Sequence, residues 1–383
     1  MNSMVSQRSA FMDERRTFFN FKNKPKLSIA LKRPVRVSVV SSQKTDKSIK
    51  VGILGATGYA GLELIRCIAS HPYFHVSLIT AGKEAKEAGQ SIGAIFPHLI
   101  TRDLPDLVAI NDADFSRVDA VFCCLPHGTS QEVIKSLPNR LKIVDLSVDF
   151  RLLDVIDYAK WYGQPHKALE LQKHAVYGLT EIHRKKIQSA SLVANPGCYP
   201  TAILLPLVPL IKANLIALED ITIYLNSGVG ETGYLGTYLN PLSLYVLPEV
   251  EQELSDAANS KVTVTFISPT SPPKALRRCM LLSITVQMNT EASVEDLKQH
   301  LEGFYEKEEF VVLRHEGDEA THTKKVLGSN DCHINVFPDD CVPGRVTIIS
   351  VIDKLVKGAS GQALQNLNLM MGIPENLGLN CMP

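Results

Sequence analysis

Residues 50–68, KVGILGATGYAGLELIRCI, decide the first half of the fold. Their opening run, Lys50–Leu54, is short and apolar, as expected of a buried parallel strand. Three glycines follow at G-x-x-G-x-x-G spacing, and apolar residues then recur at helical intervals. Glycines between a strand and a helix let the backbone approach a diphosphate, which the helix N-terminus attracts. We therefore predict a dinucleotide site, with a tight turn that binds no ligand as the alternative, and the candidate contacts are Gly55, Thr57, Gly58, Tyr59, Ala60 and Gly61.

Later apolar runs extend this pattern to a sheet. They cover His75–Thr80, Ala120–Leu125 and Lys142–Leu146, and strands that alternate with helical segments predict an open α/β sheet. The second strand ends at Thr80 and is followed by Lys83, where an NAD-binding protein usually carries an acid. Because a hydroxyl and an ammonium suit a 2′-phosphate better than a carboxylate would, we predict that the cofactor is NADP.

Polar residues after these strands are further candidates. His127, in the turn PHGTS, is placed either to contact nicotinamide or phosphate or to cap the next helix. Asp149 and Arg151 follow the strand at Lys142–Leu146 and could form a structural ion pair. The carboxyl ends of parallel strands meet at one edge of a sheet, so these residues are expected near the cofactor crevice.

The stretch VANPGCYPTAILLPL, residues 193–207, predicts a nucleophile at Cys198. Asn195-Pro-Gly197 forces a turn after a short strand, and Pro200 suits the first turn of a helix. The dipole and unpaired N–H groups of a helix start lower the pKa of a thiol toward neutrality and so supply thiolate. We therefore expect Cys198 to be catalytic, whereas Asn195 is expected to shape the turn more than to touch substrate.

The composition limits the other functions. A chain of 383 residues suggests two domains, and its 40 basic and 40 acidic side chains cancel, so nothing points to nucleic acid or to an acidic membrane surface. No apolar run approaches the ~20 residues that span a bilayer. The eight cysteines show neither a CxxC pair nor Cys/His ligand spacing, which argues against a disulfide framework and a metal site. Any charged substrate must therefore be held by local groups.

Residues 1–49 have a different composition from the rest of the chain. They are rich in Lys, Arg and Ser and contain only Asp13, Glu14 and Asp46 as acids. No apolar core of a secretory signal is present, so we predict an organelle transit peptide, for the chloroplast first and the mitochondrion second. A disordered basic tail is the alternative.

Several motifs together resemble one known family. GATGYAG, LPHGTS, DLSVDFRL, WYGQPH, VYGLTEI, VANPGCYPT and KGASGQALQNLNLMMG occur in this order. They resemble the plant-type branch of the N-acetyl-gamma-glutamyl-phosphate reductase family, within the semialdehyde dehydrogenase superfamily. The likeness covers nearly all of residues 50–378, and VANPGCYPT followed by KGASGQALQN is its most specific part.

The resemblance implies a fold and a reaction. It implies a Rossmann-type NADP-binding domain at 50–195, a central α+β catalytic domain at 196–350 that makes the contact of a homo-oligomer, and a C-terminal helix at 351–383 that returns to the first domain. The implied enzyme works in arginine synthesis in the plastid. It reduces N-acetylglutamyl 5-phosphate with NADPH to the 5-semialdehyde through a thioester on Cys198, and Ser227 and Gly228 are implied cofactor contacts.

Three features depart from the family's pattern. The family places a general acid/base histidine, in His-Arg-His, just before Pro-Glu-Ile-Glu-Gln, whereas Leu244, Tyr245 and Val246 precede Pro248-Glu-Val-Glu-Gln252 here. The stretch after Ser227-Gly228 is shortened and rewritten. The family's Asp-Asn pair before the last helix reads Asp353-Lys354, which removes an amide expected at nicotinamide.

These departures leave alternatives open. The chain could be an enzyme with a substitute base, for which His127, His183 and His333 are candidates. It could be a non-catalytic NADPH-binding paralogue, or the departures could reflect a misassembled gene model. Aspartate-semialdehyde dehydrogenase, which shares the glycine turn and the cysteine, is the alternative enzyme. Arg184 could hold a substrate carboxylate or phosphate, or form a surface ion pair.

Overall fold

The computed structural model describes residues 48–81, 86–97, 104–225, 241–267, 278–315 and 323–379. Side chains of the helix that begins at residue 241 are described from Val246 onward. Almost all of the predicted transit segment, together with Lys83, Ser227 and Gly228, lies outside the described residues.

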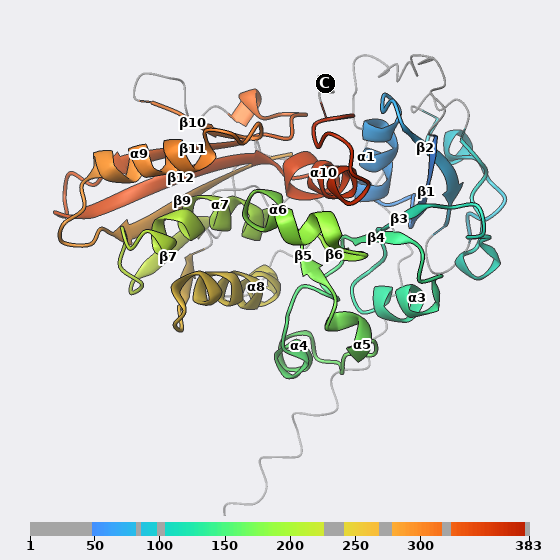
Figure 1. Cartoon of the computed structure of the whole chain (residues 1–383), viewed down its shortest axis with the longest axis horizontal. Coiled ribbons are helices and arrows are strands. Elements are labelled where there is room, and N and C mark those ends of the chain that lie inside the picture. Colours follow the sequence, from blue (N-terminus) through green and yellow to red (C-terminus); the bar gives the residue numbers. More distant parts are fainter. Residues whose placement is uncertain are drawn as a thin grey trace, which may run out of the picture. The chain divides into compact units, whose positions relative to one another are not determined.

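The first sheet has six strands, which are all parallel and lie in the order β2-β1-β3-β4-β6-β5 (Figure 1). Its strands are β1 Ile49–Leu54, β2 Phe74–Ile79, β3 Ala120–Cys123, β4 Lys142–Asp145, β5 Val176–Tyr177 and β6 Leu192–Ala194. The helices along this part of the chain are α1 Tyr59–Ile68, α2 Ile92–Ile95, α3 Ser130–Ser136, α4 Val155–Tyr162, α5 Leu169–Gln172 and α6 Thr180–Ser189, with a 3-10 turn at Ile110–Asp112. The strand order reverses between β1 and β3, where ligands bind at the carboxyl ends of such sheets.

The second sheet also has six strands, in the order β10-β11-β12-β9-β7-β8. Antiparallel pairing joins its centre, and the outer pairs β10-β11 and β7-β8 are parallel. Its strands are β7 Ile221–Leu225, β8 Val264–Ile267, β9 Cys279–Gln287, β10 Val311–Leu313, β11 Cys332–Pro338 and β12 Arg345–Asp353, with a 3-10 turn at Thr323–Lys325. Alternate residues of β9 are buried in one core with helices α7 Cys198–Lys212, α8 Pro241–Ala258 and α9 Val294–Tyr305.

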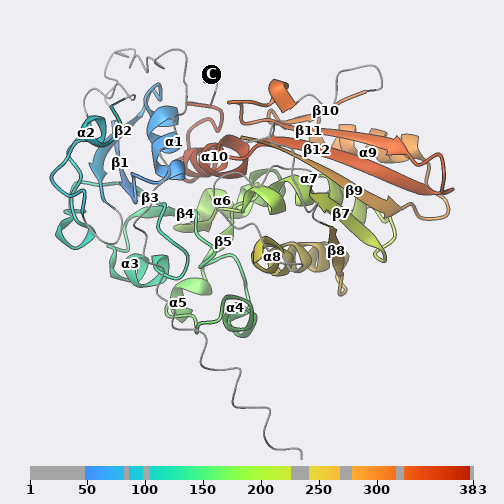
Figure 2. The ribbon, with the colours of Figure 1, turned by 180° about the vertical axis from the view of Figure 1, so that it is seen from behind.

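The chain passes between the cores of the two sheets twice near one point. After β6 it enters α7, whose residues from Tyr199 to Ile211 are all buried with the second sheet. After β12 it forms a π-helix, Val356–Ser360, and then α10, Gly361–Met370. Helix α10 packs its apolar residues into the core of the first sheet, and Figures 1 and 2 both show it beside α1. The α/β class with a Rossmann-type sheet and a second α+β part is thereby confirmed.

Gly55 should be the least replaceable glycine of the first sheet. Its φ is +77°, and an added Cβ would lie 2.6 Å from the carbonyl oxygen of Cys124. Gly163 has a similar φ of +72°, but nothing lies within 4 Å of its Cβ position. We expect Gly163→Ala to lower the free energy of unfolding by about 1 kcal/mol through backbone strain, and Gly55→Ala by about 2–4 kcal/mol because backbone blocks the methyl group. Urea denaturation measures both, and equal losses would contradict the steric argument.

Candidate active site

The glycine turn between β1 and α1 is tight on its inner side and open on its outer side. Gly55 N–H donates to Thr80 Oγ1 (3.1 Å), and a Cβ at Gly61 would lie 2.7 Å from both Ala56 Cα and Gly55 O. At Gly58 the nearest atom to such a Cβ is 3.5 Å away, and no side chain caps the start of α1. Backbone donors at an uncapped helix start are suited to phosphate. This turn, residues 55–61, therefore fits the diphosphate of a dinucleotide and is called the cradle below.

Two of the predicted cofactor contacts, Thr80 and Ala60, accept hydrogen bonds from protein groups. Thr80 is fully buried, and its hydroxyl accepts the Gly55 N–H, so it supports the turn from behind. The contact of Thr80 with a 2′-phosphate remains a prediction. Ala60 carries a carbonyl that accepts a hydrogen bond from Ser360 Oγ (2.9 Å), which ties α1 to the π-helix. Tyr59, beside it, is 65% exposed at the open side of the turn.

Cys198 is the first residue of α7, as its sequence surroundings predict. Gly197 caps the helix with extended backbone (φ −73°, ψ 164°), and its carbonyl accepts both the N–H and the hydroxyl of Thr201. Pro200 lies in the first turn, where its missing N–H removes no helical bond. Cys198 itself is half-buried, so its sulfur stands at the margin of the core.

The π-helix forms the wall against which Cys198 packs. A Cβ added to Gly358 would lie 2.5 Å from Cys198 Cβ and 3.1 Å from Cys198 Cα. It would also lie 3.4 Å from the carbonyl oxygen of Asp353, so the segment that leaves β12 passes directly over the cysteine. Only glycine at position 358 permits this approach.

The charge environment of Cys198 differs from the expectation. Burial raises the pKa of the Cys198 thiol above its ordinary value. The Lys354 ammonium, the Tyr199 N–H, the Arg151 guanidinium and the cysteine's own N–H each lower the pKa, but together they do not outweigh burial. The N–H groups of the helix start thus lower the pKa as predicted, but burial is the larger effect, so the net shift is upward.

A buried ion pair beneath Cys198 was not predicted from the sequence. Arg151 Nη1 lies 3.0 Å from Glu249 Oε2, and both side chains are buried. Glu249 Oε1 also accepts the hydroxyl of Tyr177 (2.7 Å) and the N–H of Gly197 (3.1 Å), so the carboxylate holds the turn that carries the nucleophile. Arg151 Nε is buried without a hydrogen-bond partner in the described chain.

Arg151 and Asp149 do not pair with each other. Asp149 instead accepts the backbone N–H of Gly128 (2.6 Å) and the hydroxyl of Tyr158 (3.2 Å), which fixes the turn after β3. His127 lies in this turn, and its Nδ1 accepts the N–H of Val148 (3.2 Å). Desolvation of the ring by the protein around it lowers the pKa of His127 to about 4, and the Arg151 guanidinium adds to this effect. The residue as a whole is nevertheless exposed.

The two predicted substrate contacts are occupied by protein groups. Arg184 forms ion pairs with Glu375 (2.5 Å) and Glu308, as in the ion-pair alternative, and its contact with substrate remains a prediction. Asn195 is fully buried and donates to the carbonyl of Ala359 (3.1 Å), as a residue that shapes the turn would.

The histidines considered as substitute bases are held by different partners. His183 Nε2 lies 2.9 Å from Glu253, and His333 contacts the Arg314 guanidinium at 3.2–3.4 Å. Burial and Arg314 lower the pKa of His333 to about 4. None of these contacts, nor that of His127 with Val148, involves Cys198.

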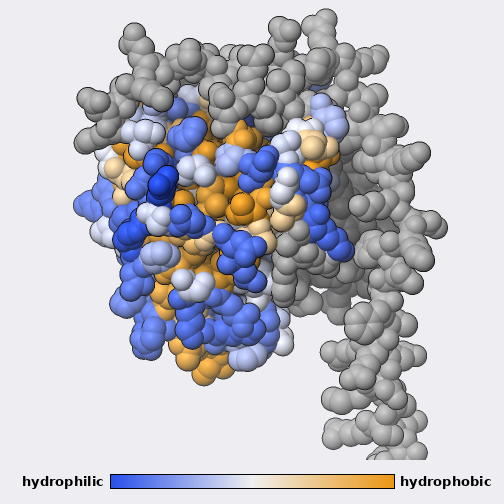
Figure 3. All heavy atoms as spheres, turned by 90° about the vertical axis from the view of Figure 1, so that its right-hand side faces the viewer, coloured by the Kyte–Doolittle hydropathy of each residue, from blue (hydrophilic) through white to orange (hydrophobic). Residues whose placement is uncertain are grey.

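An open hollow at the edge of the first sheet is separate from this site. Lys50, His75 and Val118, near the amino ends of β1, β2 and β3, help to line it. Figure 3 looks onto this side, where apolar side chains lie among hydrophilic ones. Ligands of parallel sheets bind at the carboxyl ends, so the hollow is not the cofactor site. Within the described ranges, no group of three or more potential metal ligands occurs, and no helix is long and apolar enough to cross a bilayer.

Comparison with known proteins places the chain in a family. The family model of the semialdehyde dehydrogenase NAD binding domain matches residues 50–190, and that of the semialdehyde dehydrogenase dimerisation domain matches residues 246–354. A protein of Arabidopsis thaliana, named probable N-acetyl-gamma-glutamyl-phosphate reductase, chloroplastic, is 56% identical over 90% of this chain and 87% of its own length. One of Oryza sativa subsp. japonica with the same name is 51% identical over 95% and 92%.

The chain belongs to the N-acetyl-gamma-glutamyl-phosphate reductase family. A reductase of this family from Rhodospirillum rubrum is 44% identical over 88% of the chain and 99% of its own length. The crystal structure of aspartate semialdehyde dehydrogenase with NADP from Candida albicans covers 86% of the chain with a TM-score of 0.64 at 15% identity, which shows a common fold. In this reductase family member, the glycine turn lies in the matched NAD binding domain, and Glu249 lies in the matched dimerisation domain.

Lys354 should govern how readily Cys198 ionises. Lys354→Met removes a cation that lowers the thiol pKa, so we expect the pH profile of alkylation by iodoacetamide at Cys198 to move upward by about one unit. Since the thiolate is the reactive form, the rate at neutral pH should fall. Mass spectrometry of the labelled peptides gives the rate at Cys198, and exposed Cys341 is an internal reference. An unchanged profile would show that Lys354 does not act on the sulfur.

Proposed function

We propose that this chain reduces N-acetyl-L-glutamyl 5-phosphate with NADPH to N-acetyl-L-glutamate 5-semialdehyde, with release of phosphate, in arginine biosynthesis. The observation that carries the proposal is Cys198 at the start of α7, packed on Gly358 with Lys354 and Arg151 acting on its sulfur. The names of relatives at 51–56% identity supply the substrate.

The covalent step uses groups of this chain alone. The Cys198 thiolate attacks the acyl carbon, a C–S bond forms, and the C–O bond to phosphate breaks, so phosphate leaves with the electron pair and a thioester remains. The N–H groups of Cys198 and Tyr199 act on the Cys198 sulfur. At the same helix start they are suited to stabilise the negative charge that develops on the acyl oxygen during the attack. Arg151 offers its unpaired Nε–H to the negative charge of the acyl phosphate.

The cofactor is proposed to bind in the cradle between β1 and α1. The cradle residues are Gly55, Thr57, Gly58, Tyr59, Ala60 and Gly61, with Lys83, His127, Ser227 and Gly228 as further proposed contacts. Bound NADPH would supply the hydride that reduces the thioester to the aldehyde. The Cys198 sulfur is the leaving group when the aldehyde forms, so it returns to the thiolate.

The cellular setting follows from the relatives and the N-terminal sequence. The Arabidopsis and rice relatives are named chloroplastic, and the basic, serine-rich segment at 1–49 suits a plastid transit peptide. The match to a dimerisation domain supports assembly of this chain into a homo-oligomer. The proposed domains are 50–195 for the cofactor, 196–350 for catalysis and 351–383 for the returning helix.

Cys198→Ser tests the proposed chemistry. We expect reduction of N-acetylglutamyl phosphate to fall by roughly 10³-fold or more, because a hydroxyl at this site is a far weaker nucleophile, while NADPH affinity stays unchanged. Phosphate release and NADPH oxidation by the wild type and the variant give the answer. Turnover of aspartyl phosphate alone would indicate aspartate-semialdehyde dehydrogenase instead. NADPH binding without phosphate release from either substrate would indicate a non-catalytic paralogue.

Lys83→Glu tests the preference for NADP. Loss of the ammonium and gain of a carboxylate should raise the KM for NADPH by roughly tenfold or more, while the KM for NADH changes little because NADH lacks the 2′-phosphate. Steady-state kinetics with the two cofactors compares the effects. Equal changes in both KM values would mean that Lys83 does not bind the 2′-phosphate.

A further inference from the structure

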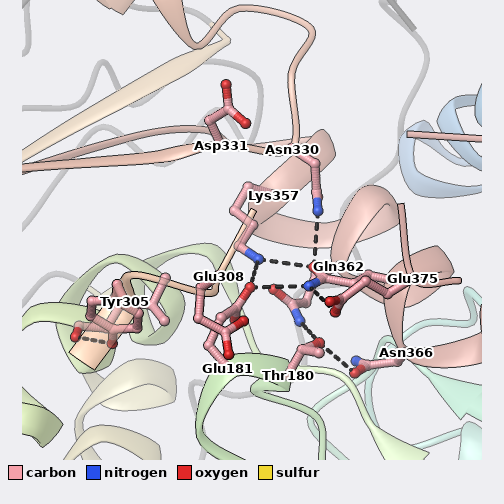
Figure 4. A network of polar contacts seen from close by, with 12 residues as sticks. Thr180, Glu181, Tyr305, Glu308, Asn330, Asp331, Lys357, Gln362, Asn366 and Glu375 are labelled. Atoms are coloured by element: carbon pink, nitrogen blue, oxygen red, sulfur yellow. Dashed lines mark hydrogen bonds and ion pairs between the residues drawn. The ribbon is translucent and has the colours of Figure 1, made fainter. Parts of the chain in front are cut away.

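A lysine next to Gly358 is completely buried. Lys357, in the π-helix, has no exposed side-chain surface, and its Nζ donates to Glu181 Oε1 (2.6 Å) and Gln365 Oε1 (3.0 Å). The ammonium also lies 5.6 Å from the centre of the Phe310 ring. Figure 4 shows Lys357 directed at Glu181, with α10 residues on the other side. The pair thus joins the wall of the nucleophile site to α6.

This pair is a poor device for stability alone. Taking an ammonium and a carboxylate out of water costs more than their attraction returns unless every lone pair and proton is satisfied. Glu181 Oε2 is buried and has no hydrogen-bond partner in the described chain. Burial acts to raise the pKa of Glu181, but Lys357 outweighs it and holds the pKa below its ordinary value, so the carboxylate stays ionised. A wholly apolar contact of similar volume would stabilise the fold at least as well.

The pair belongs to a larger buried network that reaches the nucleophile turn. Thr180, next to Glu181 on α6, donates to Asn366 Oδ1 (2.8 Å), and Asn366 Nδ2 donates to Asn195 Oδ1 (3.1 Å). Asn195 Nδ2 in turn donates to the carbonyl of Ala359, two residues after Lys357. Hydrogen bonds therefore link the turn before Cys198, the π-helix and helices α6 and α10.

A small movement of the π-helix would change the packing against Cys198. Gly358 leaves no room, since its Cβ position lies 2.5 Å from Cys198 Cβ. The same segment begins with Lys354, whose charge acts on the sulfur. A shift toward Cys198 would produce a clash, and a shift away would withdraw the cation. The segment 354–360 can therefore shift very little without changing its contact with Cys198. A directional ion pair restricts such shifts more than apolar packing does.

We propose that Lys357 and Glu181 are positioning residues for Cys198: their buried ion pair fixes the π-helix so that Gly358 packs on the nucleophile and Lys354, at the start of the same segment, keeps its place. The inference rests on the proposed nucleophilic role of Cys198. It predicts that loss of the pair impairs the chemistry of the cysteine even where the protein remains folded and binds its cofactor.

The test replaces both members of the pair together. Lys357→Met/Glu181→Leu leaves neither charge buried alone, so the fold is preserved better than in either single variant. Lys173→Met/Glu170→Leu is the control, because it removes a similar Lys–Glu pair whose side chains are 64% and 82% exposed. The full chain of each variant is compared for thermal unfolding, NADPH affinity, the pH profile of iodoacetamide alkylation at Cys198, and kcat and KM.

The expected result separates positioning from structural support. In the Lys357/Glu181 variant, the alkylation profile moves to higher pH and kcat falls roughly 10- to 100-fold, while NADPH affinity and the alkylation of Cys341 match the control. An alkylation profile and kcat equal to those of the control would overturn the proposal, whatever happens to the unfolding temperature. Alkylation needs no turnover, so failure of the proposed reaction leaves this readout intact.

A milder variant keeps the inference testable if the double variant does not fold. Gln365→Met removes the amide that accepts from Lys357 and donates to Glu181 Oε1 (3.1 Å), without unpairing either charge. We expect a smaller upward shift of the Cys198 alkylation profile in the folded protein. An unchanged profile in this variant would count against positioning by the network.

Discussion

The contact between Gly358 and Cys198 is the constraint on which the rest of the site depends. The chain leaves the first sheet at Cys198 and returns toward it at Gly358, and these two passages touch with no space for a methyl group. The contact fixes where α7 begins relative to β12. Ser360, just beyond it, bonds to the carbonyl of Ala60 in the cofactor cradle. One close approach of two backbones therefore sets the nucleophile against both the cradle and the cation that precedes Gly358.

Burial and charge have opposite effects on the pKa of the Cys198 thiol, and burial has the larger effect. The helix start, Lys354 and Arg151 all favour the thiolate, yet the pKa of the Cys198 thiol is raised. A site that excludes water strengthens every electrostatic interaction within it, including those that stabilise the transition state. The same exclusion makes the resting thiol harder to ionise. The two cations therefore matter more here than at an exposed helix start, where the dipole alone can be sufficient.

Local signals in the sequence predicted the parts of the site that are formed by neighbouring residues. The glycine turn lies within seven residues and Cys198 within its own turn, so spacing and turn chemistry were enough. Contacts between distant positions were not predicted, because Arg151 meets Glu249 98 residues later and Lys357 meets Glu181 176 residues earlier. No periodicity encodes such pairs. The surroundings of Thr80 were not predicted for a related reason: its place at the end of β2 was predicted, but the direction of its hydroxyl depends on how β2 packs beside β1.

The energetics of proton transfer explain why the described residues favour cations over a histidine as activators of Cys198. The pKa of His127 is lowered to about 4, whereas the pKa of the Cys198 thiol is raised, so this imidazole is a poor acceptor for the thiol proton. Glu249 is already bonded by Arg151, Tyr177 and Gly197, so its two oxygens hold the turn that carries Cys198. Lys354 and Arg151 need accept no proton, because they act by stabilising the thiolate once it forms.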